Sequence, residues 1–261
     1  MNVLIKYIRA NPFALRVSQA LYHKSRLAFA QLVSSLRGVK YFPPEPGDDG
    51  RYQSQFGQDA ILERLNLLRQ GGRFLEVGAN NPIRNSNTYY LEHHWKYTGV
   101  SIDPLDYSSE YRKSRPNTVF LNNAIDSENS HIELIVPEKR EGWEDQLTSK
   151  YNMSDLKSRD DRVSTIRVQT TTIADVVKRF GEFDILFIDV EGMEPEVLKS
   201  NDWEAWRPFT VVIENNGDVN PRGEIRAKMK QLGYKQVAQI GSTDEVYVNI
   251  IASGQQDGIS R

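Results

Sequence analysis

The stretch Phe74-Leu75-Glu76-Val77-Gly78-Ala79-Asn80 decides the fold. Its first four residues have the pattern of a short buried strand, which then enters a turn of small residues at Gly78. Because glycine carries no Cβ, a ligand can approach the backbone closely at that point. A strand followed by glycine is common in α/β sheets, so the residues around this stretch must decide what binds there.

On both sides of this stretch, short apolar runs alternate with helical patterns. Strands are expected at 97–103, 119–124, 131–136, 165–170, 183–189, 209–214, 235–240 and 246–251, and helices at 88–95, 108–114, 173–180, 194–199 and 224–232. This alternation predicts an α/β domain with a mostly parallel sheet and helices on both faces. In such sheets ligands bind beyond the carboxyl ends of the strands.

The composition excludes several classes of site. Of 261 residues, 39% are hydrophobic and 26% are charged, which is typical of a globular protein. Cysteine is absent, so disulfides, thiolate nucleophiles and cysteine-ligated metals are excluded. The four histidines include no pair spaced i, i+4 on a helix, which disfavours a catalytic zinc.

Charge divides the chain into two parts. Residues 1–44 hold seven Lys or Arg and no acid, a net +7, which leaves the remainder at 26 − 35 = −9. We expect 1–44 to form one or two basic amphipathic helices, broken near Asn11-Pro12, followed by a linker at 45–50 and the main domain at 51–261. The acidic charge of the main domain argues against nucleic acid as a partner.

The basic segment has three possible roles. It packs on the body, or it contacts an anionic membrane, or it is an organellar transit peptide. It contains no apolar run of the ~18 residues that a membrane span needs and no secretory signal pattern. We therefore expect a cytoplasmic protein with possible peripheral contact at the inner membrane face; whether it forms a homo-oligomer stays open.

The next predicted strand supplies a partner for the glycine turn. Asp103 ends that strand 25 residues after Gly78, where a carboxylate can accept hydrogen bonds from both ribose hydroxyls of a nucleoside. The G-x-G-x-x-G pattern of dinucleotide sites is not met, because Asn80 and Ile83 hold the later glycine positions. Glu76 would repel phosphates and suits a ligand with an amino group and a sulfonium. S-adenosylmethionine is the predicted cofactor.

Four blocks of sequence together resemble a known family. They are Ser54-Gln55-Phe56-Gly57-Gln58-Asp59, Phe74-Leu75-Glu76-Val77-Gly78-Ala79, Ser86-Asn87-Thr88 with Leu91-Glu92, and Phe187-Ile188-Asp189-Val190-Glu191-Gly192-Met193-Glu194. In this order, across about residues 52–251, they resemble the FkbM family of S-adenosylmethionine-dependent methyltransferases. The resemblance implies a Rossmann-like domain with a seven-stranded sheet and an antiparallel last strand.

The same resemblance implies an activity and a set of acceptors. It implies O-methylation of a hydroxyl, in a sugar of a polysaccharide or glycolipid or in a macrolide-type natural product. One position departs from the family: Pro82 stands where the family turn usually has a glycine, and proline cannot adopt a positive φ.

The resemblance also assigns roles to individual positions. Gly78, Ala79 and Asn80 would lie along the methionine part of the cofactor, Glu76 near its amino group, Asp103 at the ribose, and Asn123 and Ala124 beside the adenine. Gln58 would help to close the pocket, or cap a helix together with Asp59. Thr88 is expected to cap a helix, and Asn87 to contact the cofactor or the acceptor.

The acids after two later strands suggest the chemistry. Asp189 and Glu191 can point to one face, where either could act as general base on the acceptor hydroxyl. The set Asp189, Glu214 and Asn215 is similar to the magnesium ligands of catechol O-methyltransferase-like enzymes, so Mg²⁺ is a second possibility. A third possibility is that these acids only stabilise the next helix, by their interaction with the positive end of its dipole.

Two other classes of function stay open at this stage. The same turn and Asp103 would also suit a nicotinamide-dependent oxidoreductase, or a non-catalytic module that binds a nucleoside or a glycan. Titration with each cofactor distinguishes the oxidoreductase from a methyltransferase. The cluster of acids disfavours the binding module, which would not need it. Residues 138–162 are expected to form an insertion near the site, in which Trp143 and Tyr151 are candidates for stacking on a sugar acceptor.

Overall fold

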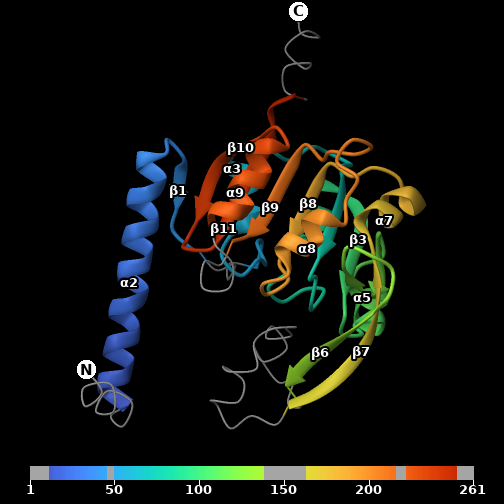
Figure 1. The fold of residues 1–261 in the computed structure, drawn as a ribbon, viewed down its shortest axis with the longest axis horizontal. Helices are drawn as coiled ribbons and strands as arrows, with labels where there is room; N and C mark the ends of the chain where they lie inside the picture. Colours follow the sequence, from blue (N-terminus) through green and yellow to red (C-terminus); the bar gives the residue numbers. More distant parts are fainter. Residues whose placement is uncertain (1–11, 46–49, 138–162, 216–221, 252–261) are drawn as a thin grey trace, which may run out of the picture.

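An eight-stranded sheet forms the centre of the computed structural model, which describes residues 12–45, 50–137, 163–215 and 222–251 (Figure 1). The strand order is β1-β10-β11-β9-β8-β2-β3-β4. The strands are β1 (Lys40–Phe42), β2 (Arg73–Val77), β3 (Thr98–Asp103), β4 (Thr118–Asn122), β8 (Ile185–Ile188), β9 (Thr210–Glu214), β10 (Tyr234–Ile240) and β11 (Asp244–Asn249). β11 is antiparallel to both of its neighbours, and the other pairs are parallel. The predicted α/β class is confirmed.

The eighth strand corrects the predicted number of seven. It is β1, which lies in the segment expected to be helical and pairs in parallel with β10, Phe42 opposite Ile240. Within the described part of that segment, Pro12–Leu36 does form a helix, α2. A strand of three residues shows no periodicity in a sequence, so hydrophobic patterning could not reveal it.

Helices cover both faces of the sheet. They are α3 (Gln58–Arg64), α4 (Tyr89–Trp95), α5 (Ser108–Ser114), α7 (Ile173–Phe180), α8 (Glu194–Lys199) and α9 (Arg222–Gln231). Side chains alternate along β2, so that Leu75 and Val77 join a core with residues of α7, α8 and α9, whereas Phe74 joins one with residues of α3 and α4. This two-sided burial explains the nearly continuous apolar run of the strand.

A second, smaller sheet lies beside the carboxyl ends of the main strands. It has the order β5-β7-β6, formed by β5 (Ala124–Ile125), β6 (His131–Pro137) and β7 (Val163–Thr171), with the long pair β6 and β7 extending away from the main sheet (Figure 1). Its apolar residues Ile132, Leu134 and Val168 pack with Met193. The single strand expected at 119–124 is thus divided, its last residue belonging to this second sheet.

None of the described helices combines the length and apolarity needed to cross a bilayer.

Candidate active site

The turn after β2 is locked against two neighbouring strands. The backbone N–H groups of Gly78 and Ala79 both donate to the carbonyl of Ile102 on β3, at 3.0 and 3.1 Å. Gly78 has φ +83°, and a Cβ built on it would lie 1.7 Å from the carbonyl oxygen of Asp189, just after β8. Glycine is therefore required here both for its backbone conformation and for the close approach of β8.

Asp103 at the end of β3 holds the same turn. Its Oδ2 accepts from the backbone N–H of Asn80 at 2.8 Å, and its Oδ1 accepts from that of Leu105 at 2.8 Å. Asn80 adopts φ +50°, a left-handed conformation that asparagine tolerates better than most residues. The carboxylate is thereby fixed at the mouth of the turn.

A cavity of about 900 Å³, open to solvent, lies at the carboxyl ends of β2, β3 and β8. Its place is the one expected for a ligand site in an α/β sheet. Nine of the predicted site residues line it: Gly78, Ala79, Asn80, Asn87, Asp103, Asn123, Ala124, Asp189 and Glu191. The structure thus brings together most of the residues that the sequence singled out.

Some of the residues that line the cavity were not among the predicted site residues. The small sheet contributes an apolar wall through Ile132 and Leu134, to which Met193 adds its side chain. Gln55 and Asn85 contribute amide groups. The alternating pattern at 131–136 marks a strand, but no local signal shows that this strand folds over the site.

Gln55 reaches the cavity because Asp59 anchors the loop before it. Asp59 Oδ2 accepts from the backbone N–H of Gln53 at 2.8 Å and of Ser54 at 3.3 Å, and Ser54 forms a β-bridge with Asn85. Asp59 is fully buried, and burial raises its pKa despite these hydrogen bonds. The Ser-Gln-x-Gly-Gln-Asp block is therefore a loop anchor that presents Gln55.

Gln58, predicted to close the cofactor pocket, does not line the cavity. Its Nε2 donates to Asp244 Oδ1 at 2.9 Å, and its Oε1 accepts from the backbone N–H of Phe56 at 2.9 Å. The side chain is directed toward β11 because Asp244 there is a buried acceptor. Gln58 positions an acid beside the site.

Glu76, predicted near the amino group of the cofactor, also lies outside the cavity lining. It shares the face of β2 that bears Phe74, so its side chain turns toward α4. Its Oε2 accepts from Thr88 Oγ1 at 2.7 Å and Ser101 Oγ at 2.8 Å. Complete burial raises the pKa of this carboxyl, and the nearby Arg115 opposes that shift. Thr88 bonds Glu76 rather than capping α4, for which no side-chain cap is formed.

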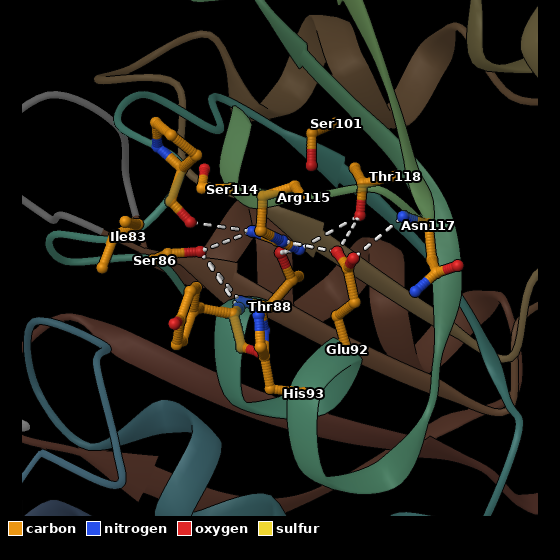
Figure 2. A network of polar contacts seen from close by, with 12 residues as sticks. Ile83, Ser86, Thr88, Glu92, His93, Ser101, Ser114, Arg115, Asn117 and Thr118 are labelled. Atoms are coloured by element: carbon orange, nitrogen blue, oxygen red, sulfur yellow. Dashed lines mark hydrogen bonds and ion pairs between the residues drawn. The ribbon is translucent and has the colours of Figure 1, made fainter. Parts of the chain in front are cut away.

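Arg115 is the centre of a buried polar network that ties the loop before α4 to β4 (Figure 2). Its Nε donates to Glu92 at 2.5 Å, and both side chains are almost fully buried. One terminal nitrogen donates to the carbonyl of Pro82 at 3.0 Å and to Ser86 at 3.2 Å. The other donates to Thr88 at 2.9 Å. The network fixes the loop that carries Asn85 and Asn87 into the cavity.

The same network explains why proline is tolerated at position 82, where the family usually has glycine. Pro82 is buried, and its carbonyl accepts from Arg115. The left-handed conformations of this loop are supplied by Asn80 and by Asn85, which has φ +59°. A glycine is therefore not needed at position 82 for the turn to close.

Acidic side chains gather where β8, β9 and β11 meet. Burial and the nearby carboxylates of Glu191 and Asp244 raise the pKa of Asp189 well above its usual value. Burial and the charges of Glu194 and Asp244 raise the pKa of Glu191 to about 7, and burial raises that of Asp244 to about 6. Glu191 also adopts φ +51°, an uncommon conformation for this residue type. Burial and mutual repulsion thus raise the pKa of each of these acids.

The predicted magnesium ligands do not assemble into a site. Asp189 lines the cavity, but Glu214 and Asn215 do not. Asn215 is instead drawn into a buried group, where its Nδ2 donates to Glu245 at 3.0 Å. Within the described ranges, no three of His, Asp and Glu are placed to hold a metal ion. The Mg²⁺ prediction is not supported.

The candidates for sugar stacking, Trp143 and Tyr151, lie outside the described residues.

A mostly parallel sheet with a polar cavity beyond its carboxyl edge defines a Rossmann-like α/β enzyme fold. The chain belongs to the methyltransferase FkbM domain family, whose model matches residues 76–235, more than half of its length. It is therefore a methyltransferase by family. No curated protein matches the chain.

Several solved structures are similar to the chain at low identity. An O-methyltransferase from Bacillus cereus in complex with SAH has 12% identity and a TM-score of 0.38, with 86% of this chain and 90% of that chain covered. Precorrin-6y C5,15-methyltransferase from Geobacter metallireducens has 9% identity and a TM-score of 0.41, with 78% and 92% covered. Fibrillarin from Methanococcus jannaschii has 11% identity and a TM-score of 0.40, with 69% and 67% covered.

Proposed function

We propose that this methyltransferase takes the methyl group of S-adenosylmethionine and transfers it to a hydroxyl oxygen of a saccharide in a surface glycan or glycolipid. The observation that carries the proposal is the cavity itself. It joins a glycine turn, a fixed carboxylate at the end of the next strand, and a pair of acids after β8.

The residues that line the cavity fit the cofactor by their chemistry. Gly78 lines the cavity without a side chain, and Asp103 offers a carboxylate to ribose hydroxyls. Asn123 and Ala124 would lie beside the adenine, near the apolar wall of Ile132 and Leu134. The side-chain oxygen of Asn87 is buried and accepts no hydrogen bond within the described part of the chain, so a donor on the ligand would satisfy it.

When bound, S-adenosylmethionine supplies an electrophilic methyl group on a sulfonium. The task of the protein is then to orient the acceptor oxygen and to remove its proton. Glu191 is suited to be the base, because a pKa of about 7 lets it both hold and release a proton at neutral pH. Asp189, which lines the same cavity, would orient the acceptor by a hydrogen bond.

The nicotinamide alternative is disfavoured by the family and by charge. The pyrophosphate of a dinucleotide would lie close to Asp189 and Glu191 in the same cavity, and the turn lacks the glycines that admit it. The raised pKa values of these acids are typical of a catalytic site, which disfavours a module that only binds.

The experiment is methyl transfer from labelled S-adenosylmethionine to extracted glycolipids and capsular or cell-wall saccharides, with and without a chelator. We expect chelator-resistant labelling of a saccharide hydroxyl, stable to base as an ether is. Labelling of amines, or transfer that requires added magnesium, would contradict the proposed acceptor or the proposed base. The matched variants are Glu191→Gln, expected to lose transfer, and Glu196→Gln on α8, expected to retain it.

A further inference from the structure

Helix α2 buries one face against the body of the protein and leaves an apolar face exposed. Ala30 and Ser34 are buried, at 3% and 2% exposure, on the side toward the body. Leu21, Phe29 and Leu32 are 62%, 64% and 57% exposed. Figure 1 shows α2 standing along one flank of the molecule beside β1, at the edge of the main sheet.

The exposed apolar residues lie on one face of the helix. Leu21, Phe29, Leu32 and Leu36 are separated by three, four or eight residues, close to whole turns at 3.6 residues per turn. Ala30 comes nine residues after Leu21, about two and a half turns, so the buried and the exposed apolar faces are opposite. Leu36 is 79% exposed, which extends the outer face to the end of the helix.

Basic residues accompany this outer face, and acids are absent from the helix. Pro12–Leu36 contains no Asp or Glu, and its cations Lys24 and Arg26 lie beside this face. Lys24 is exposed, and at 100° per residue it lies on one flank of the apolar face, whereas Arg26 lies on the other, with its guanidinium 5.6 Å from the ring centre of Tyr22. Apolar side chains flanked by cations are the arrangement that binds an anionic membrane surface.

From this we infer that α2 docks the protein on an anionic lipid bilayer, with Leu21, Phe29, Leu32 and Leu36 inserted among the headgroups and the cations against lipid phosphates. Charge selects the bilayer over a second copy of the chain. Two copies joined through this face would bring two acid-free, positively charged helices together, whereas the lipid supplies the missing negative charge. The inference does not depend on methyl transfer.

The test is flotation of the full-length protein with vesicles of phosphatidylcholine, alone or mixed with phosphatidylglycerol. We expect binding to the anionic vesicles that weakens as salt is raised. The double variant Phe29→Ser/Leu32→Ser should lower the partition coefficient by at least about tenfold, because it removes two inserted side chains without changing charge. Lys24→Gln should weaken binding to anionic vesicles by a smaller factor.

Matched controls separate this face from general hydrophobicity. Leu32→Ser should reduce binding, whereas Val119→Ser, which removes an exposed apolar side chain from β4, should bind as the wild type does. Circular dichroism must show the same helix content in every variant. The inference is overturned if the wild type ignores anionic vesicles or the double variant binds as tightly. It is equally overturned if light scattering finds that the wild type is a dimer and the double variant a monomer, while neither protein binds lipid. A second copy of the chain would then cover this face.

Discussion

Gly78 is the residue at which the turn after β2 passes close to the carbonyl group of Asp189, just after β8. Alanine there would need both a positive φ and space that the carbonyl of Asp189 occupies. We predict that Gly78→Ala lowers the free energy of unfolding by roughly 2 to 6 kcal/mol, from backbone strain and overlap together. Urea denaturation measures this change.

Gly71 supplies the matched control for that substitution. It also has a positive φ, +66°, but an added Cβ would meet nothing within 4 Å. Gly71→Ala should therefore cost about 1 to 2 kcal/mol, the conformational part alone. Equal losses in the two variants would show that the contact with Asp189 is unimportant.

Glu191 is the residue whose protonation should govern the rate. A base acts when deprotonated, so with a pKa of about 7 the rate should rise with pH through 7 and then level off. Glu191→Gln should lower kcat by about 100-fold or more and remove this rise. A pH–rate profile measures both effects, and an unchanged profile in the variant would assign the proton to another group.

The pH dependence of the free energy of unfolding gives an independent check on the carboxyl group of Glu191. The pKa of Glu191 is raised above its ordinary value of 4.5, so the folded state holds its proton more tightly than the unfolded chain does. Its contribution therefore becomes unfavourable as pH rises from about 4.5 to about 7. Glu191→Gln should be more stable than the wild type at pH 8, which shows that lost activity is not lost folding.

The sequence predicted which residues lie around the cavity, but it did not predict where each of their side chains points. Gly78, Asp103 and Asp189 follow from strand ends, because parallel strands bring their carboxyl ends to one edge. Glu76 was misplaced because alternation along β2 turns it toward Thr88, and the network that receives it depends on Arg115, distant in the sequence.

At the scale of elements, the Arg115 network joins α4, α5 and β4 through a buried ion pair. Removal of the arginine would leave Glu92 charged and buried. We predict that Arg115→Met lowers the free energy of unfolding by about 3 to 5 kcal/mol, measured by urea denaturation. Arg112→Met, at an exposed site on α5, should change it by less than about 0.5 kcal/mol.

A double-mutant cycle tests whether the pair acts as a unit. Arg115→Met/Glu92→Leu should cost less than the sum of the two single variants, because the second change removes the orphaned charge. Strict additivity would mean that the ion pair contributes little and that the surrounding hydroxyls hold the loop.

Helices of at least one full turn were predictable from the sequence, whereas the two shortest strands were not. The helices at 108–114 and 194–199 have the predicted bounds, since each shows a helical pattern between breaking residues. β1 and β5 have three and two residues, too few to show a period. The small sheet was missed as a unit because its pairing of β5 with β7 joins segments more than 40 residues apart.

At the scale of the whole molecule, the N-terminal segment completes the main sheet. β1 covers the edge of β10, and Phe42 packs in the core beside Ile240. We predict that a chain starting at residue 45 melts about 5 to 10 °C lower than the full chain and tends to aggregate, because it loses a buried phenylalanine and exposes a strand edge.

Thermal melting with light scattering measures that difference. The full-length Phe29→Ser/Leu32→Ser variant is its control and should melt as the wild type does, because both side chains are exposed. Truncation is accordingly a poor test of membrane binding, as it damages the body as well. A shortened chain that melts at the temperature of the full chain would show that β1 adds nothing to the fold.

The central claim is that the cavity beyond β2 and β3 binds a sulfonium nucleoside. Isothermal titration of the folded protein with S-adenosylhomocysteine tests it most directly. We predict one site per chain, and at least about tenfold weaker binding in Asp103→Asn, which loses a charge-assisted acceptor for the ribose hydroxyls. Absence of heat with either S-adenosylhomocysteine or S-adenosylmethionine, on protein with native circular dichroism, would contradict the claim.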